Sequence, residues 1–339
     1  MQGFGFHLSP LRERSDRASS TRRVRIVFNQ TKPTPHPIVR CTPIDLSNKG
    51  ERCGNTLALH YHIPMRIDCH IHVVPPALPG VGSLSPVLRS NTDNVAVALK
   101  REMQLAGIDQ ALAMGEYRCT DTDPLGITST LAIAERVPGL RAIGICDPLR
   151  GDDTNHLKRV ESILADSRVA ALKCYLGYLH FEPAHPGYRR YYELAGMFKK
   201  PVIFHTGDTF SVQAKLKYAM PLGVDEVAVD HPDTKFVLAH LGNPWMTEAA
   251  EVVYKNLNVW ADLSGLLVGD DVDYASETVT DTTARLRNAF RFAERPNRFV
   301  YGSDWPLIPM AAYAEFIRRA IPAEFHELVF AENAGKLFS

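Results

Sequence analysis

The sequence lacks the features that would indicate a membrane or nucleic-acid-binding protein. Its 339 residues contain no run of 18 apolar residues, so no membrane-spanning helix is expected. The N-terminus has no apolar signal core. The formal net charge is zero, whereas nucleic-acid-binding domains are usually strongly basic. We therefore expect neither a membrane nor a nucleic acid as a partner.

Cysteine is sparse and shows no disulfide framework. The chain has six cysteines, and they are scattered. Cys69, Cys119, Cys146 and Cys174 lie in or just after apolar, strand-like runs, where free thiols behave as small hydrophobic side chains. This usage is typical of a reducing compartment, and we expect a cytoplasmic protein.

The zero net charge hides a basic N-terminal segment. Residues 1–64 hold eight Arg and two Lys against two Asp and two Glu, a formal charge of +6, so residues 65–339 carry −6. The stretches "RERSDRASSTRRVR" and "TKPTPHPIV" could bury little surface, so we expect a disordered or loosely packed extension. An organelle-targeting segment and a nucleic-acid-binding arm are alternatives. We favour the simple extension, because Met65 opens a clear strand.

From Met65 onward, apolar strand-like runs alternate with helix-periodic segments. Such alternation predicts a parallel sheet covered by helices, and eight units in about 275 residues is the size of a (β/α)8 TIM barrel. The expected strands are residues 65–73, 110–116, 140–148, 169–176, 201–208, 235–242, 258–266 and 299–306. A doubly wound open sheet is the alternative, but it normally has a glycine-rich turn after its first strand. Here the first strand is followed by "VVPPALPG". We therefore expect a barrel over 65–339.

The first strand, "MRIDCHIHV", carries polar side chains at alternate positions. Asp68, His70 and His72 should share one face, because alternate residues of a strand project to the same side. Ile67, Cys69, Ile71 and Val73 should then fill the opposite face. A polar face on the first strand is expected if it points into the mouth of the barrel.

Other expected strands also end in chemically active side chains. These are Glu116, Lys173, His205, His240 and Asp304. In a barrel the carboxyl ends of the strands form one rim, where active sites are built. A single histidine at a strand end is more often a hydrogen-bonded structural residue than a ligand. The repeated placement at strand ends nevertheless favours a shared metal site, because imidazole and carboxylate are ligands that suit zinc and related metals.

Several stretches resemble the amidohydrolase superfamily, in the branch that includes amidohydrolase-related decarboxylases and lactone hydrolases. They are "IDCHIHV", "ALKCYLGY", "YYELAGMFKKPVIFHTGD", "HPDTKFVLAHLGNPW", "NVWADLSG" and "VYGSDWP". Together they span residues 65 to about 306, and the extension before Met65 lies outside the resemblance.

The resemblance implies roles for individual residues. His70, His72, His205 and Asp304 would hold one divalent metal, for which we expect Zn2+. His240 would polarise the substrate or transfer a proton. Lys173 would either remain a cation that anchors substrate or, if carbamylated, bridge two metals. We favour one metal.

The expected reaction is hydrolysis of a small carboxylated ester, lactone or amide by metal-activated water. Asp304 would be the proton shuttle, and His240 would stabilise the developing oxyanion. Asp68 would orient a ligand imidazole. Arg118, with Lys173, is a candidate anchor for a substrate carboxylate.

Two alternatives to hydrolysis remain open at this stage. Non-oxidative decarboxylation by a metal-dependent lyase on the same scaffold would need the same residues, and fold does not separate it from hydrolysis. A metal-binding protein without activity is a third interpretation, disfavoured because buried polar groups without a task are costly. We expect a small-molecule substrate, with a homo-oligomer and a monomer both open.

Overall fold

The computed structural model describes residues 65–339, and the expectations for residues 1–64 lie outside this range. Eight parallel strands follow one another around a barrel in chain order. They are β1 (Ile67–His72), β2 (Gln110–Met114), β3 (Leu140–Ile145), β4 (Val169–Cys174), β5 (Val202–Phe204), β6 (Phe236–Leu238), β7 (Val259–Asp262) and β8 (Phe299–Val300). Each lies within its expected range, which confirms the TIM barrel.

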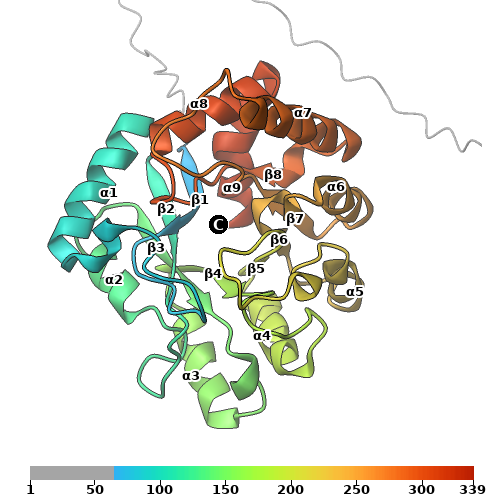
Figure 1. The fold of residues 1–339 in the computed structure, drawn as a ribbon. Coiled ribbons are helices and arrows are strands. Elements are labelled where there is room, and N and C mark those ends of the chain that lie inside the picture. The colour runs from blue at the N-terminus through green and yellow to red at the C-terminus, as the bar shows by residue number, and fades with distance from the viewer. Residues whose placement is uncertain (1–64) are drawn as a thin grey trace, which may run out of the picture. The chain divides into compact units, whose positions relative to one another are not determined.

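Helices surround the strands, as Figure 1 shows. The α-helices are α1 (Thr92–Ala106), α2 (Thr128–Ala134), α3 (Thr154–Leu164), α4 (Pro186–Met197), α5 (Gly223–Asp230), α6 (Met246–Lys255), α7 (Glu277–Phe292), α8 (Met310–Ala320) and α9 (Asn333–Leu337). Short helical turns are η1 (Pro86–Arg89), η2 (Pro148–Arg150), η3 (Leu216–Tyr218), η4 (Ala239–Gly242), η5 (Pro296–Arg298), η6 (Ala323–Phe325) and η7 (Leu328–Glu332). None of the helices between residues 65 and 339 is long and apolar enough to cross a membrane.

The core has two main layers. A larger cluster joins the outer faces of the strands to the helices, and it includes Leu99, Val160 and Tyr188. A smaller cluster takes side chains from all eight strands, among them Leu112 and Ile203, and is therefore the barrel interior. Residues of α9 belong to this inner cluster, so the last helix packs against the interior.

Backbone hydrogen bonds between β1 and the segment after β8 complete the ring. Cys69 N–H donates to the Tyr301 carbonyl at 2.9 Å, and His72 N–H donates to the Trp305 carbonyl at 2.7 Å. Asp304 N–H donates to the carbonyl of His70 at 2.8 Å. This pairing brings Asp304 next to the histidines of β1, although they are more than 200 residues apart in the chain.

The strict alternation expected in β1 is wrong. The register of β1 against β2 shifts between Asp68 and Ile71, which indicates a β-bulge. Ile67 and Cys69 belong to the inner cluster, whereas Ile71 belongs to the outer one. A bulge inserts an extra residue and changes which face the following side chains occupy. His70 and His72 therefore face the cavity, and Asp68 does not share their face.

Candidate functional site

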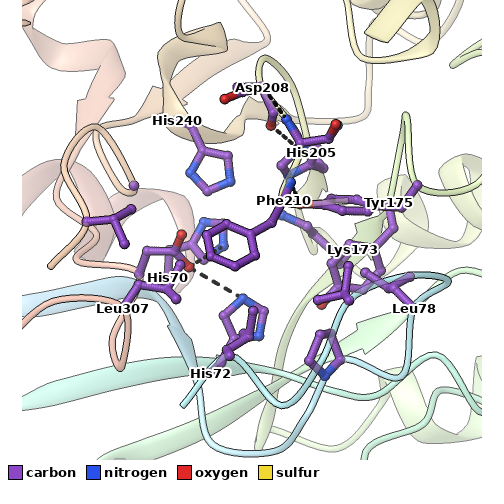
Figure 2. Close-up of a pocket in the computed structure, with 18 of the residues that line it drawn as sticks. His70, His72, Leu78, Lys173, Tyr175, His205, Asp208, Phe210, His240 and Leu307 are labelled. Carbon is purple, nitrogen blue, oxygen red and sulfur yellow. Dashed lines mark hydrogen bonds and ion pairs between the residues drawn. The ribbon is translucent and has the colours of Figure 1, made fainter. Parts of the chain in front are cut away.

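A cavity of about 140 Å³ lies at the carboxyl ends of the strands. Its lining comes from β1 and β4 and from the segments that follow β1, β4, β5, β6, β7 and β8. Figure 2 shows several of these side chains converging on one space. The structure thus brings His70, His72, Lys173, His205, His240 and Asp304 to one cavity.

Two histidines of β1 lie against the carboxylate of Asp304. Asp304 Oδ1 is 3.4 Å from His72 Nε2 and 3.7 Å from His70 Nε2. All three side chains are buried, and Asp304 Oδ1 has no hydrogen-bond partner among the described residues. One ligand atom from each residue lies within 4.8 Å of the others. Two imidazole nitrogens and an unpartnered carboxylate oxygen at this spacing fit a divalent metal ion.

His205 and His240 extend the imidazole cluster. The ring centroid of His240 is 4.8 Å from that of His70 and 4.9 Å from that of His205. His205 Nε2 lies 2.9 Å from the Asp208 carbonyl, which fixes the orientation of the ring. His240 Nδ1 lies 2.9 Å from Ser264 Oγ. Four imidazoles therefore line the cavity.

Asp262, at the end of β7, contacts two histidines of this cluster. Its Oδ2 is 2.9 Å from His70 Nδ1, and its Oδ1 accepts the backbone N–H of His240 at 3.1 Å. A carboxylate on the far nitrogen of a metal-ligating histidine fixes the tautomer of the ring. The sequence analysis gave Asp262 no role, although it ends its strand in the same way as the other candidates.

Asp68 makes different contacts from those expected. Its Oδ1 accepts the backbone N–H groups of His70 and Ser303, at 3.2 and 2.9 Å. It therefore tethers β1 to the segment after β8, and Asp262 makes the imidazole contact that was expected of Asp68. Burial raises the pKa of Asp68 to about 7. The reason for the difference is the β-bulge, which turns Asp68 away from the cavity.

Burial disfavours the charged forms of His70, His205 and His240. It lowers the pKa of His70 to about 4, helped by the charge of Lys173 and opposed by Asp262. Burial also lowers the pKa values of His205 and His240. Burial alone would raise the pKa of Asp304, but the nearby side chains of His72, His70 and His240 outweigh it and lower this pKa. Neutral imidazoles beside an ionised carboxylate are the protonation states that metal ligands require.

The two candidate substrate anchors differ in position. Lys173 is buried and is the only lysine or arginine among the described residues that line the cavity; burial lowers its pKa to about 8. Arg118 does not line the cavity. Its side chain is 75% exposed and lies 3.8 Å from Glu116 Oε2. The expectation that Arg118 anchors substrate is not supported by its position, because its side chain is exposed and does not line the cavity.

Some lining residues had no assigned role in the sequence analysis. Tyr175, Tyr178, Phe210 and Asn243 lie in the segments after β4, β5 and β6. Tyr175 and Lys173 are two residues apart, a spacing that could have indicated a shared direction. No sequence signal places Phe210, because the path of a loop is not encoded by periodicity.

Comparison with known proteins agrees with this geometry. The family model described as amidohydrolase matches residues 67–339. The chain belongs to the amidohydrolase family. Family membership identifies it as a metal-dependent enzyme acting on a small molecule. A search of curated protein sequences finds no match.

Solved structures with the same fold are distant in sequence. One is 5-carboxyvanillate decarboxylase from Sphingomonas paucimobilis, 16% identical, covering 81% of this chain and 98% of that chain with a TM-score of 0.54. Another is an amidohydrolase from Burkholderia multivorans with bound zinc, 17% identical, covering 81% and 99% with a TM-score of 0.57. A third is 5-carboxyvanillate decarboxylase from Novosphingobium aromaticivorans with manganese, 11% identical, covering 81% and 96% with a TM-score of 0.57. These similarities show the shared barrel.

Proposed function

We propose that this enzyme hydrolyses a small carboxylated ester, lactone or amide. The observation that carries the proposal is the carboxylate of Asp304, buried at the cavity beside the imidazoles of His70 and His72. We further propose that His70, His72, His205 and Asp304 hold one divalent metal, with zinc as the expected ion. When bound, the metal would supply Lewis acidity and favour ionisation of water.

The other roles in the reaction belong to side chains of this protein. Asp304 accepts a proton from the attacking water and returns it to the leaving group. His240, which lines the cavity, polarises the scissile carbonyl group and stabilises the negative charge that develops on its oxygen. Asp262 acts through His70, whose orientation it holds. Lys173 remains a cation and attracts the substrate carboxylate.

Decarboxylation is the second candidate. It is favoured by the decarboxylases among the structures that share this barrel. In that reaction Asp304 or His240 would protonate the carbon that loses CO2. Product analysis separates the two candidates, because hydrolysis creates a new acid group, whereas decarboxylation releases CO2.

The test is a screen of lactones, esters and aromatic carboxylates with the purified protein, followed by Asp304→Asn on the best substrate. Asp304 has a φ of 65°, in the left-handed region that asparagine tolerates, so the variant should fold. Asparagine cannot accept the proton, so kcat should fall by about 10² to 10⁴. Asp152→Asn, at an exposed position away from the cavity, is the control.

Two outcomes would contradict the proposal. Release of CO2 without hydrolysis would favour the second candidate. An Asp304→Asn variant that keeps more than about a tenth of wild-type kcat, outside the expected range of losses, would remove Asp304 as the proton shuttle. Metal analysis of the same preparations tests the metal count, and two metals per chain would indicate a carbamylated Lys173.

We also propose a cytoplasmic location. All four cysteines in the described part of the chain are free thiols, and Cys69, Cys146 and Cys174 are buried. Unpaired cysteines are typical of proteins that work in reducing compartments.

A further inference from the structure

Ser264, in the segment after β7, is fully buried and contacts three side chains of the site. Its Oγ lies 2.5 Å from Asp262 Oδ1, 2.9 Å from His240 Nδ1 and 3.1 Å from His70 Nδ1. The backbone carbonyl of Ser264 also faces His240 Nδ1, at 3.2 Å. The proposed reaction gives this hydroxyl group no role.

These contacts determine where the hydroxyl proton of Ser264 lies. Asp262 Oδ1 already accepts the backbone N–H groups of His240 and Ser264, at 3.1 and 3.0 Å. Its other oxygen, Oδ2, faces His70 Nδ1. Four donors around one carboxyl group fit an ionised carboxylate, which only accepts hydrogen bonds. A separation of 2.5 Å between the hydroxyl and carboxylate oxygens requires a proton between them, so Ser264 donates to Asp262.

This arrangement leaves two acceptors beside His240 Nδ1. The hydroxyl oxygen of Ser264 has its proton on Asp262, and the Ser264 carbonyl has none to donate. Nδ1 lies against both oxygens, so it must carry the ring proton. In a neutral imidazole one nitrogen is a donor and the other is an acceptor. Nε2 of neutral His240 is therefore an acceptor.

The position of the ring directs this second nitrogen to the cavity. His240 lines the cavity, and its ring centroid lies 4.8 Å from that of His70 and 4.9 Å from that of His205. Figure 2 shows the ring reaching into the space bounded by these two histidines. The Nδ1 edge is occupied by Ser264, so the Nε2 edge faces the cavity.

The next residue keeps the contact between Ser264 and His240 close. A Cβ at Gly265 would lie 2.6 Å from His240 Nδ1 and 2.9 Å from Asp304 Oδ2. Gly265 also has a φ of 63°, in the left-handed region that favours glycine. A larger residue would be strained there and would displace the imidazole. The backbone after β7 is thus shaped to hold Ser264 against this ring.

We infer that Ser264 is a positioning residue, whose hydroxyl group fixes the tautomer of His240 so that the neutral ring presents Nε2 to the cavity as a hydrogen-bond acceptor. This side of the cavity then suits an O–H or N–H group of a ligand. The inference rests on the proposed function only for the part that His240 takes in the reaction. There, His240 stabilises a negative carbonyl oxygen in its protonated form, in which both ring nitrogens are donors.

The tautomer is measured directly by nitrogen-15 NMR of the full chain, labelled at histidine and loaded with zinc, which is diamagnetic. The spectrum distinguishes protonated from unprotonated ring nitrogens, and the signals missing from His240→Gln identify this ring. At a pH where His240 is neutral, Nδ1 should be the protonated nitrogen and Nε2 the unprotonated one. A ring protonated at Nε2 would overturn the inference.

Ser264→Ala tests whether the hydroxyl group is responsible. Nδ1 then keeps only the carbonyl contact, so the tautomer equilibrium should shift about fivefold towards Nε2–H, the usual effect of one net hydrogen bond. Thr234→Val is the matched control, because it removes a buried hydroxyl group that donates to the Tyr192 carbonyl at 2.9 Å. The control should leave the His240 signals unchanged. Equal spectra of His240 in the two variants would overturn the role of Ser264.

Metal affinity distinguishes Ser264 from Asp262. Ser264→Ala should bind zinc within about threefold of wild type, since Asp262 still holds His70 from its far nitrogen. Loss of zinc from this variant would show that Ser264 supports the metal site rather than the tautomer of His240. The NMR measurement needs no turnover, so failure of the Asp304 test would leave its result unchanged.

Discussion

The side chain of His70 is held from two sides. Its Nε2 faces Asp304 Oδ1 at 3.7 Å, and its Nδ1 lies 2.9 Å from Asp262 Oδ2. The ring is almost fully buried, and burial lowers its pKa to about 4. Since Nδ1 must donate its proton to Asp262, Nε2 is left as the acceptor that can bind a metal. Asp262 therefore decides which nitrogen faces the cavity.

We predict that Asp262→Asn weakens metal binding about 10- to 100-fold, the usual effect of removing a carboxylate behind a ligating histidine. An amide can present its NH2 group to Nδ1, which would favour the wrong tautomer. Competition with a chelator of known affinity measures the effect, and circular dichroism checks the fold. Asp281→Asn, in an exposed ion pair with Arg285, is the control. Metal affinity within about threefold of wild type would show that Asp262 does not orient His70.

At the level of single residues, the sequence predicted positions better than contacts. His70, His205, His240 and Asp304 were placed at strand ends, and the structure brings them to one cavity. Glu116 was placed by the same rule and is not among the residues that line the cavity. A position at a strand end predicts only that a residue lies at the rim of the barrel. Whether its side chain faces the cavity depends on the path of the loop that follows the strand.

Among the elements, the shortest strands carry some of the most important side chains. β5 and β6 have three residues each and β8 has two, yet His205, His240 and Asp304 follow them directly or closely. Their apolar runs predicted them because buried parallel strands are apolar on both faces. The bulge in β1 left no such signal, because a shift in register changes pairing without changing composition.

The contact between β8 and β1 depends on a residue without a side chain. A Cβ at Gly302 would lie 2.8 Å from the Cβ of His70 and 3.1 Å from that of Ser264. Such distances require a shift of β1, which also carries His72. Glycine at this position therefore lets the segment after β8 approach the histidine strand closely.

We predict that Gly302→Ala destabilises the protein by about 1–3 kcal/mol, as overpacking of a dense core usually does. It should also weaken metal binding, because His70 must move. Thermal unfolding with and without added metal measures both effects. Gly335→Ala in α9 is the control, since no atom lies within 4 Å of its added Cβ. A melting temperature for Gly302→Ala equal to that of the control would mean that the segment after β8 accommodates the added methyl group without loss of stability.

For the barrel as a whole, the ionisation of buried side chains should determine how its stability changes at acidic pH. Burial lowers the pKa of His70 from 6.5 to about 4 and also lowers those of His205 and His240. In the unfolded chain these imidazoles bind a proton near pH 6.5, whereas in the folded chain they bind it only at lower pH. The free energy of unfolding therefore decreases as the pH falls below about 6.5. Burial raises the pKa of Asp68 to about 7, and this one group opposes the trend.

We therefore predict that the metal-free protein loses stability steadily between pH 6.5 and about 4. His70 alone should contribute about 3 kcal/mol to this loss, at about 1.4 kcal/mol per unit of pKa. Asp68 should offset about the same amount over this window, so the net loss reflects His205 and His240. Calorimetric melting in chelator-containing buffers measures the change. A melting temperature that stays constant or rises as the pH falls through this window would show that the imidazoles are not held neutral.

The last prediction concerns the boundary at Met65. Tertiary contacts begin at the first described residues. Gln110 Nε2 donates to Met65 Sδ at 3.5 Å, Arg66 N–H donates to Asp109 Oδ2 at 2.8 Å, and the Arg66 carbonyl accepts from Asp109 and Gln110. A chain beginning at Met65 keeps these bonds and all of β1, so its melting temperature should equal that of the full chain. It should bind an anion exchanger more tightly, because it loses the +6 charge of residues 1–64.

A chain beginning at Cys69 is the matched control. It lacks Arg66 and also Asp68, which accepts the N–H of Ser303 and tethers β1 to the segment after β8. This shorter chain should unfold at a lower temperature or fail to fold. If removal of residues 1–64 alone lowers the melting temperature by more than about 5 °C, roughly 1–2 kcal/mol for a domain of this size, those residues stabilise the barrel and the boundary at Met65 is wrong.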